Sequence, residues 1–234
     1  MSSSGTTIQI QADDGGTFDA YLAPPPAAPG PALVLVQEIF GITGWIKETA
    51  DMFADEGYVV AAPDMFWRLE PNFVADHDVP EQRRQGLAYR GEIDHGKGVS
   101  DIDALLRHLC GLPACNGRKA VTGFCLGGTF AYLSSTRLEI DKAVSYYGTQ
   151  IHEFLDEGKN IGCPLMMHMG EHDDAFPVED RNRIHAALIG IPHVSIYIYD
   201  AGHAFCNTHR PSHYVAEEAR KAHERTLTFF GSLK

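Results

Sequence analysis

The segment Lys119–Leu133, KAVTGFCLGGTFAYL, decides the fold of this chain. Its first residues are β-prone, and the residues after Gly128 can continue as a helix. Between them stands Gly-x-Cys-x-Gly, the pattern of a nucleophile elbow with Cys125 in place of the usual serine. Glycines flank Cys125 because side chains two positions away would collide with the turn and with the neighbouring strand. The pattern therefore predicts a thiol at a sharp strand-to-helix turn.

A sulfur at this turn would stand at the start of the following helix. Free N–H groups and the positive end of the helix dipole favour a thiolate there, and the thiolate is the reactive form of cysteine. The alternative is a buried structural cysteine in a glycine-rich turn, and the motif alone leaves both interpretations open. Residues further along the chain bear on the choice.

Strand-like and helix-like segments alternate on both sides of the elbow. Two short segments at 7–11 and 17–22 flank a glycine-containing turn and predict an antiparallel hairpin. The apolar run at 32–36 is typical of a strand buried on both faces. Further strands are expected at 58–62, 142–147, 164–169 and 194–199, and helices at 45–56, around 102–109 and at 215–230.

The segment 68–98 is polar and irregular, and we expect a cap or a pair of short helices there. A leading hairpin followed by alternating strands and helices predicts a mostly parallel, eight-stranded sheet with helices on both faces. We expect a single α/β domain over residues 1–234. Right-handed crossovers place the loops after the strands along one edge of the sheet, where ligands bind in folds of this class.

Composition restricts the partners. The chain is 44% hydrophobic and 21% charged, as in an ordinary globular protein. Its net charge of −12 argues against nucleic acid or an anionic membrane as a partner, because both attract surplus lysine and arginine. Residues 1–7 show no secretory signal, no apolar run approaches the roughly 18 residues of a membrane span, and the five cysteines form no Cys-x-x-Cys pair. We expect a reduced, cytoplasmic protein, and a monomer is compatible with the sequence.

Two later loops carry an acid and a histidine. Gly170–Pro177 follows one predicted strand and contains Asp173, and Asp200–Phe205 follows the next strand and contains His203. Nucleophile, acid and histidine in this chain order is the order of α/β-hydrolases. A histidine can take a proton from a thiol and later return it, and an acid fixes the tautomer of that histidine. Since each group follows a predicted strand, we expect Cys125, Asp173 and His203 to meet.

A fourth segment, Gln37–Gly41 with the sequence QEIFG, ends the third predicted strand. This fold places the second N–H of an oxyanion hole there, and a glutamate at a buried strand end is unfavourable unless it is engaged. Together with Gly-x-Cys-x-Gly-Gly, Gly-x-x-Asp and Ala-Gly-His, the segment resembles the dienelactone hydrolases, also called carboxymethylenebutenolidases. The segments 146–148 and 224–227 match as well, so the resemblance runs from about Ile8 to Phe230.

The resemblance implies the α/β-hydrolase fold and a catalytic triad of Cys125, His203 and Asp173. Asp173 rather than Asp174 matches the family pattern, because it is the fourth residue of Gly-x-x-Asp. Glu38 would act as a gate on the thiol, pairing with the region of the sulfur and swinging away when substrate arrives.

The resemblance also implies arginines that hold the carboxylate of the lactone. Arg84 is similar in position to one of them, with Arg83 directly beside it. The other arginine is expected four residues after His203, where this chain has Asn207. Arg210, three residues further on, is a candidate substitute for it.

The implied activity is the opening of enol lactones through an acyl-enzyme, with the backbone N–H groups of Leu126 and Ile39 as the oxyanion hole. A thiolate leaves a tetrahedral adduct more easily than an alkoxide does, so the adduct of a simple ester tends to revert. An enolate is a better leaving group and can compete with the thiolate. We therefore expect a small lactone or activated ester as substrate, and neither a cofactor nor a metal.

Two rival interpretations remain open at this point. A metallohydrolase is suggested by the pairs His168/His172 and His209/His213, since i, i+4 histidines on one helix face bind zinc, although a glycine and a proline interrupt them. A non-hydrolytic binding or thiol-sensing member of the fold is the other. Within hydrolases, a cysteine enzyme for other lactones or activated esters is the alternative to a dienelactone hydrolase.

Overall fold

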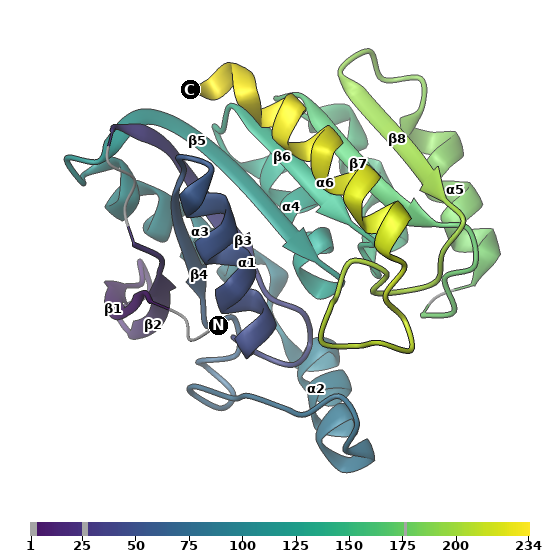
Figure 1. Ribbon diagram of the computed structural model, residues 1–234, viewed down its shortest axis with the longest axis horizontal. Helices are drawn as coiled ribbons and strands as arrows, with labels where there is room; N and C mark the ends of the chain where they lie inside the picture. The colour runs from purple at the N-terminus through teal and green to yellow at the C-terminus, as the bar shows by residue number, and fades with distance from the viewer. Residues whose placement is uncertain (1–3, 25–27, 176) are drawn as a thin grey trace.

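A computed structural model describes residues 4–24, 28–175 and 177–234 of the chain, and its centre is one eight-stranded sheet (Figure 1). The strands are β1 (Thr6–Gln11), β2 (Thr17–Leu22), β3 (Gly30–Val36), β4 (Val59–Pro63), β5 (Cys115–Phe124), β6 (Lys142–Tyr146), β7 (Leu165–Gly170) and β8 (Val194–Tyr199). They lie in the order β1-β2-β4-β3-β5-β6-β7-β8, with β2 antiparallel to both neighbours and all other pairs parallel. The predicted mostly parallel sheet of the α/β-hydrolase fold is confirmed.

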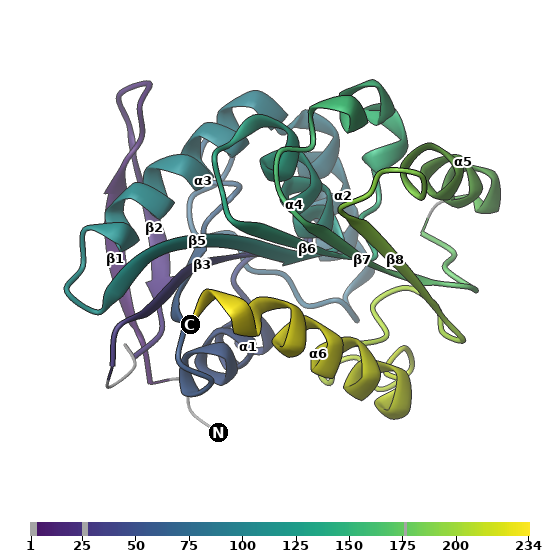
Figure 2. The same cartoon turned by 90° about the horizontal axis from the view of Figure 1, so that it is seen from above.

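Helices cover both faces of this sheet. They are α1 (Gly44–Asp55), α2 (Pro80–Glu92), α3 (His95–Cys110), α4 (Leu126–Arg137), α5 (Val178–Leu188) and α6 (Ala216–Phe230), with short 3₁₀ helices η1 (Ile151–Glu153), η2 (Leu155–Asn160) and η3 (Gly231–Leu233). Figure 2 shows α1 and α6 on one face, and α3, α4 and α5 on the other. Because both faces are covered, all seven residues of β3 are buried, as the continuous apolar run predicts.

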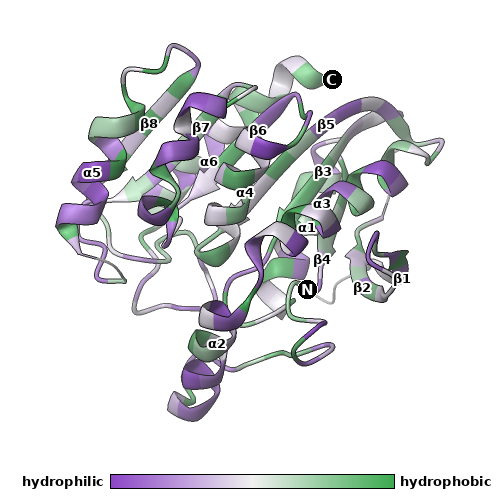
Figure 3. Ribbon diagram, turned by 180° about the vertical axis from the view of Figure 1, so that it is seen from behind, coloured by the Kyte–Doolittle hydropathy of each residue, from purple (hydrophilic) through white to green (hydrophobic). Residues whose placement is uncertain are grey.

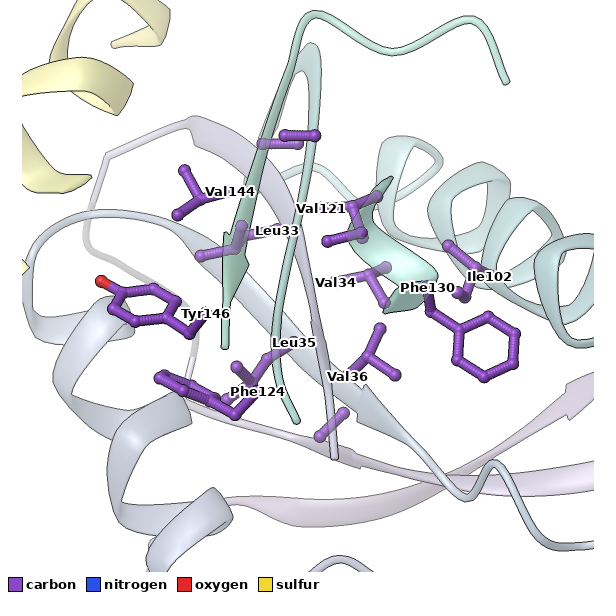
Figure 4. Packing of buried hydrophobic residues seen from close by; sticks show 14 of the residues in the cluster. Leu33, Val34, Leu35, Val36, Ile102, Val121, Phe124, Phe130, Val144 and Tyr146 are labelled. Atoms are coloured by element: carbon purple, nitrogen blue, oxygen red, sulfur yellow. The ribbon is translucent and has the colours of Figure 1, made fainter. Parts of the chain in front are cut away.

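The core lies on both sides of β3. Figure 4 shows Leu35 beside Phe124 on one side, and Val34 toward Phe130 on the other. Figure 3 shows the hydrophobic residues concentrated along the sheet, whereas α5 and much of α2 are hydrophilic. The central strands therefore form a rigid platform from which the loops at their ends extend.

Two elements differ in length from the expectation. β5 begins at Cys115 and runs for ten residues, because Cys115 pairs with Gly30 ahead of an irregularity, and the regular pairing with β3 resumes at Lys119. The segment 68–98, expected to form a cap or a pair of short helices, holds one helix of 13 residues, α2, and the first turn of α3. Proline at the start of α2 and an acidic residue in its first turn are ordinary signals of a helix start.

The carboxyl ends of the parallel strands gather along one edge of the sheet. Val36 is level with Gly123 across β3 and β5, and Tyr146 is level with His168 across β6 and β7. The loops that follow β3, β5, β7 and β8 therefore come together there, as expected for this class of fold. These loops carry most of the residues that the sequence singles out.

All five cysteines have free thiols. No described helix is long and apolar enough to cross a bilayer. Residues 1–3 of the stretch considered for a secretory signal lie outside the described residues.

Candidate active site

Cys125 stands at the turn between β5 and α4 and is only 5% exposed. Its backbone has φ 56° and ψ −115°, a conformation that L-residues rarely adopt and that is typical of strain stored at a functional turn. A Cβ on Gly123 would lie 2.4 Å from the carbonyl oxygen of Gly127, and one on Gly127 would lie 2.1 Å from that of Val36. The steric reason predicted for the flanking glycines is therefore confirmed.

His203 and Asp173 form a buried pair on the loops after β8 and β7. The Nδ1 atom of His203 lies 2.8 Å from Oδ2 of Asp173, and the two side chains are 9% and 2% exposed. The other oxygen of Asp173 accepts a hydrogen bond from the N–H of Ala175 at 2.9 Å. Both carboxylate oxygens are thus engaged, whereas the neighbouring Asp174 is exposed.

His203 also interacts with Cys125. Burial alone would lower the pKa of His203, but the charge of Cys125 and hydrogen bonds with Asp173 and Cys125 outweigh burial and raise the pKa to about 10. A histidine with this pKa is an imidazolium at neutral pH. The structure thus brings together the three residues that the sequence places on separate loops.

Glu38 lies beside this group at the end of β3 and is 2% exposed. Its Oε2 accepts a hydrogen bond from Nδ2 of Asn207 at 2.8 Å, whereas Oε1 has no hydrogen-bond partner among the described residues. Burial raises the pKa of Glu38, although the charges of His203 and Arg210 act in the opposite direction. A cavity of about 410 Å³ opens beside Glu38 and Asn207, and its described lining includes neither Cys125 nor His203.

Two backbone N–H groups lie at this edge of the sheet, one at the elbow and one in the turn after β3. Leu126 is the first residue of α4, so its N–H has no partner within the helix. Ile39 lies in the turn after β3, and the close approach of Gly127 to Val36 brings the end of β3 against the elbow. In the part of the chain that the structure describes, neither N–H donates to another backbone carbonyl.

Arg210 is buried, with 7% of its surface exposed. Its guanidinium lies over the ring of Phe40, 5.6 Å from the centroid, and its Nη2 donates to Nε2 of His213 at 2.9 Å. Among the described residues, none of the ion pairs involves Arg210. A buried guanidinium with no direct ion pair favours an anionic ligand beside it, although the charge of Glu38 already offsets part of the cost of its burial.

The structure does not place Arg84 beside Cys125, His203 or Glu38. It lies on α2, its side chain is 69% exposed, and it pairs with Glu81. Its neighbour Arg83 is exposed as well, and its charge is the last of the influences that lower the pKa of His213, after burial and the charges of Arg210 and His203.

The histidine pairs that suggest a metal site do not converge. His168 is buried between Tyr199 and Thr226, and burial lowers its pKa to about 3. His172 lies at the surface and pairs with Asp200. The members of the second pair also bond to different partners, one to a glutamate and the other to an arginine. Neither pair offers two nitrogens to one ion.

Tyr147, to which the sequence gives no role, packs against His203. The two ring centroids are 5.0 Å apart at 66°, the backbone φ of Tyr147 is 39°, and its buried hydroxyl has no hydrogen-bond partner among the described residues. Burial, and then the charge of Glu38, raise the pKa of Tyr147 well above its usual value. The Tyr-Tyr-Gly segment at the end of β6 is the sequence signal for Tyr147, because the ends of the neighbouring strands carry the other site residues.

Comparison with known proteins gives full-length matches. The sequence profile described as the dienelactone hydrolase family matches residues 18–234. The chain is 35% identical over 228 residues to the carboxymethylenebutenolidase of Pseudomonas putida, which covers 97% of this chain and 96% of the relative. It is 34% identical over 227 residues to carboxymethylenebutenolidase 1 of Cupriavidus pinatubonensis, which covers 97% of each chain.

Solved structures share the fold. A crystal structure from Klebsiella pneumoniae, ascribed to a dienelactone hydrolase, matches with a TM-score of 0.85 and 24% identity over 97% of this chain and 98% of that one. A dienelactone hydrolase-like promiscuous phosphotriesterase from metagenomic libraries matches with a TM-score of 0.78 and 22% identity over 98% of both chains. Because the family profile and the curated relatives cover nearly the whole chain, the chain belongs to the dienelactone hydrolase family and is a hydrolase of ester or lactone bonds.

Proposed function

We propose that the chain is a cysteine-dependent hydrolase that opens enol lactones of the dienelactone type. The observation that carries the proposal is that Cys125, at a strained strand-to-helix turn, lies close enough to the buried His203–Asp173 pair to raise the pKa of His203. The names of the curated relatives support a butenolide-type lactone as substrate. The free thiols support the expectation of a reducing cytoplasm, which stays a prediction.

Acylation uses the Cys125 thiolate as nucleophile. Its sulfur attacks the carbonyl carbon of the lactone, and the carbonyl oxygen becomes an oxyanion that the N–H groups of Leu126 and Ile39 bind. The adduct then collapses by breaking the bond between the carbonyl carbon and the ring oxygen. This leaves a thioester on Cys125 and an enolate at the other end of the opened chain. His203 gives its proton to that enolate.

The pKa of His203 changes during the reaction, and this change determines when the proton is transferred. The charge of Cys125 is the first of the influences that raise the pKa of His203. A thioester carries no charge, so acylation lowers the pKa of His203 and favours release of its proton when the leaving group needs it. Neutral His203 then takes a proton from the attacking water. The second adduct expels the Cys125 thiolate, which restores the imidazolium–thiolate pair and frees the acid.

The leaving group decides which substrates such a site can use. From the tetrahedral adduct, a thiolate departs more readily than an alkoxide but must compete with an enolate. An enol lactone therefore partitions toward the acyl-enzyme, whereas the adduct of an alkyl ester reverts. The same reasoning includes activated aryl esters, whose phenolate leaving groups are also weakly basic.

A substrate panel tests this proposal. It contains enol lactones with and without a carboxylate, a saturated lactone of the same ring size, and an aryl ester, with intact-protein mass spectrometry to find an acyl group on Cys125. We expect turnover of the enol lactones and the aryl ester, and little of the saturated lactone. Turnover of the saturated lactone at the same rate, or of the aryl ester alone, would move the assignment to a cysteine hydrolase of other esters.

The pH profile tests the gate. Asn207 donates to Glu38, and this hydrogen bond lowers the pKa of Glu38 against the effect of burial. Replacing Asn207 by leucine removes the donor, so the pKa of Glu38 rises and a smaller fraction of Glu38 is ionised at a given acidic pH. If the reaction uses ionised Glu38, the acid limb of kcat/KM shifts to higher pH, and the plateau above it stays. Steady-state kinetics between pH 5 and pH 9 measure this shift.

Two further variants make that result specific. Glu38→Gln is expected to remove the limb, because the titrating group is gone, while lowering the plateau through loss of the gate. Thr208→Ala, at the exposed neighbour of Asn207, is expected to leave the profile unchanged. If the acid limb of kcat/KM does not shift in folded Asn207→Leu, Glu38 is excluded as the group whose ionisation sets that limb.

Arg210 is the cation that we assign to a carboxylated substrate. It is buried, close enough to Glu38 to influence its pKa, and without an ionic partner in the described chain. A charge-assisted hydrogen bond to a substrate carboxylate contributes about 1.5–3 kcal/mol. Replacing Arg210 by methionine is therefore expected to lower kcat/KM on a carboxylated enol lactone about 10- to 150-fold, and that on a neutral aryl ester little.

The ratio of kcat/KM on the carboxylated lactone to kcat/KM on the aryl ester is the control for folding, because a damaged fold lowers both values. Arg84→Ala is the matched cation control, since Arg84 is exposed and pairs with Glu81. We expect no change of the ratio in Arg84→Ala. A changed ratio there, with none in Arg210→Met, would return the role to the position that the sequence suggested.

A further inference from the structure

The turn that carries Ile39 is held by the chain between β4 and α3. On one side, Gly41 forms a β-bridge with Val74. Gly41 has φ 80°, and a Cβ there would lie 1.8 Å from the carbonyl oxygen of Phe73, so only glycine fits. The segment before α2 thus fixes one end of the turn.

α2 holds the other side of the turn. Gly86 is the buried residue of this helix. A Cβ on Gly86 would lie 2.3 Å from the carbonyl oxygen of Ile39 and 3.2 Å from its carbonyl carbon, so the helix backbone rests directly on Ile39. A second attachment is the ring of Tyr89, which packs edge-on against Phe73 with centroids 5.1 Å apart. The rest of α2 projects beyond the sheet (Figure 1) and is largely hydrophilic (Figure 3).

We infer that Gly86 is a positioning residue for the reaction: it seats α2 on Ile39 and thereby fixes the direction of the Ile39 N–H. The inference rests on the proposed function, since it takes this N–H as an oxyanion donor. The N–H and the carbonyl of Ile39 belong to one residue, so a helix that pushes the carbonyl away rotates the N–H as well. Oxyanion donors act only within a few tenths of an ångström, and a displacement of about 1 Å lowers rates about 100-fold.

This positioning role gives a function to α2 and to the rest of the chain between β4 and α3. An exposed helix with one buried residue contributes little to the core, but it closes the side of the oxyanion turn that the sheet leaves open. Gly86 is needed because any side chain would occupy the place of the Ile39 carbonyl. The substituted helix and the Ile39 turn cannot both keep their positions.

A pair of alanine variants on the same helix tests the inference. In Gly86→Ala, the methyl group meets the Ile39 carbonyl, whereas in Gly91→Ala it meets no other atom within 4 Å. Alanine favours a helix over glycine at both positions, so helix propensity is matched. With 4-nitrophenyl acetate as substrate, we expect kcat/KM to fall at least about 10-fold in Gly86→Ala, as for a weakened oxyanion donor, and to stay within twofold in Gly91→Ala.

Alkylation of Cys125 by iodoacetamide supplies the readout that a merely structural defect would change. This reaction needs the thiolate but forms no oxyanion, and mass spectrometry of the Cys125 peptide follows it separately from the other thiols. We expect Gly86→Ala to be alkylated at the rate of the unmodified chain. Full turnover in Gly86→Ala, or alkylation that falls in step with turnover because of a displaced thiol or a lost fold, would overturn the inference.

The same assays distinguish failure of the proposed function from failure of the role of Gly86. If the unmodified chain does not hydrolyse 4-nitrophenyl acetate, or acquires no acyl group on Cys125, the proposed function fails. If it does both and Gly86→Ala equals it, the function stands and only the role of Gly86 is lost.

Discussion

Replacing Cys125 by alanine is expected to abolish hydrolysis of enol lactones and aryl esters, with a loss of at least about 1,000-fold in kcat. The sulfur is the atom that forms the thioester, and no other described thiol lies at the elbow. The fold is expected to persist, because alanine keeps the Cβ of a small side chain that is 5% exposed, and the strained φ of 56° is the same for both residues. Steady-state kinetics and thermal melting measure the two effects.

Cys125→Ser separates nucleophile chemistry from side-chain shape. A hydroxyl fills nearly the same volume but ionises far less readily than a thiol, so this variant is expected to lose at least about 100-fold in kcat. In either variant the charge of Cys125 is gone while Asp173 remains, and the pKa of His203 is expected to fall from about 10. An NMR titration of the imidazole checks this. Near-normal activity in either variant would remove Cys125 from the mechanism.

The elbow and the two partner loops could be predicted from the sequence because their constraints are local. Gly123 and Gly127 are required by backbone atoms within a few residues or on the adjacent strand. The loops with Asp173 and His203 each follow an apolar strand, and parallel strands end at one edge whatever their detailed packing. Chain order was therefore enough to expect these groups together.

The surroundings of the site could not be predicted in the same way. Asn207 and Glu38 are 169 positions apart, and their hydrogen bond depends on the path of the loop after β8. The outward direction of Arg84 depends on the rotation of α2, whose sequence lacks a clear apolar face that would define it. The close contact of Gly86 with Ile39 has no signal in the sequence except the glycine itself. Contacts set by a peripheral helix and a long loop need the three-dimensional structure.

Replacing Asp173 by asparagine is expected to lower kcat by about 100- to 10,000-fold. One oxygen of Asp173 accepts from the N–H of Ala175 and the other from Nδ1 of His203, so the carboxylate serves two donors at once. An amide has one acceptor oxygen, and its NH₂ group must therefore face one of these donors. If it faces His203, the ring takes the wrong tautomer; if it faces Ala175, the loop after β7 opens and the pair is lost.

The pKa of His203 adds a second readout to this prediction. The charge of Asp173 and its hydrogen bond both raise that pKa, so Asp173→Asn is expected to lower it even with Cys125 in place. Asp174→Asn is the matched control, because Asp174 is the exposed neighbour in the same loop. We expect the control to keep kcat within about threefold, as for other surface substitutions. Kinetics and NMR titration of both variants measure these effects. A severe loss of kcat in Asp174→Asn with a mild loss in Asp173→Asn would assign the acid of the triad to Asp174. The hydrogen bond between Asp173 and His203 would then be structural only.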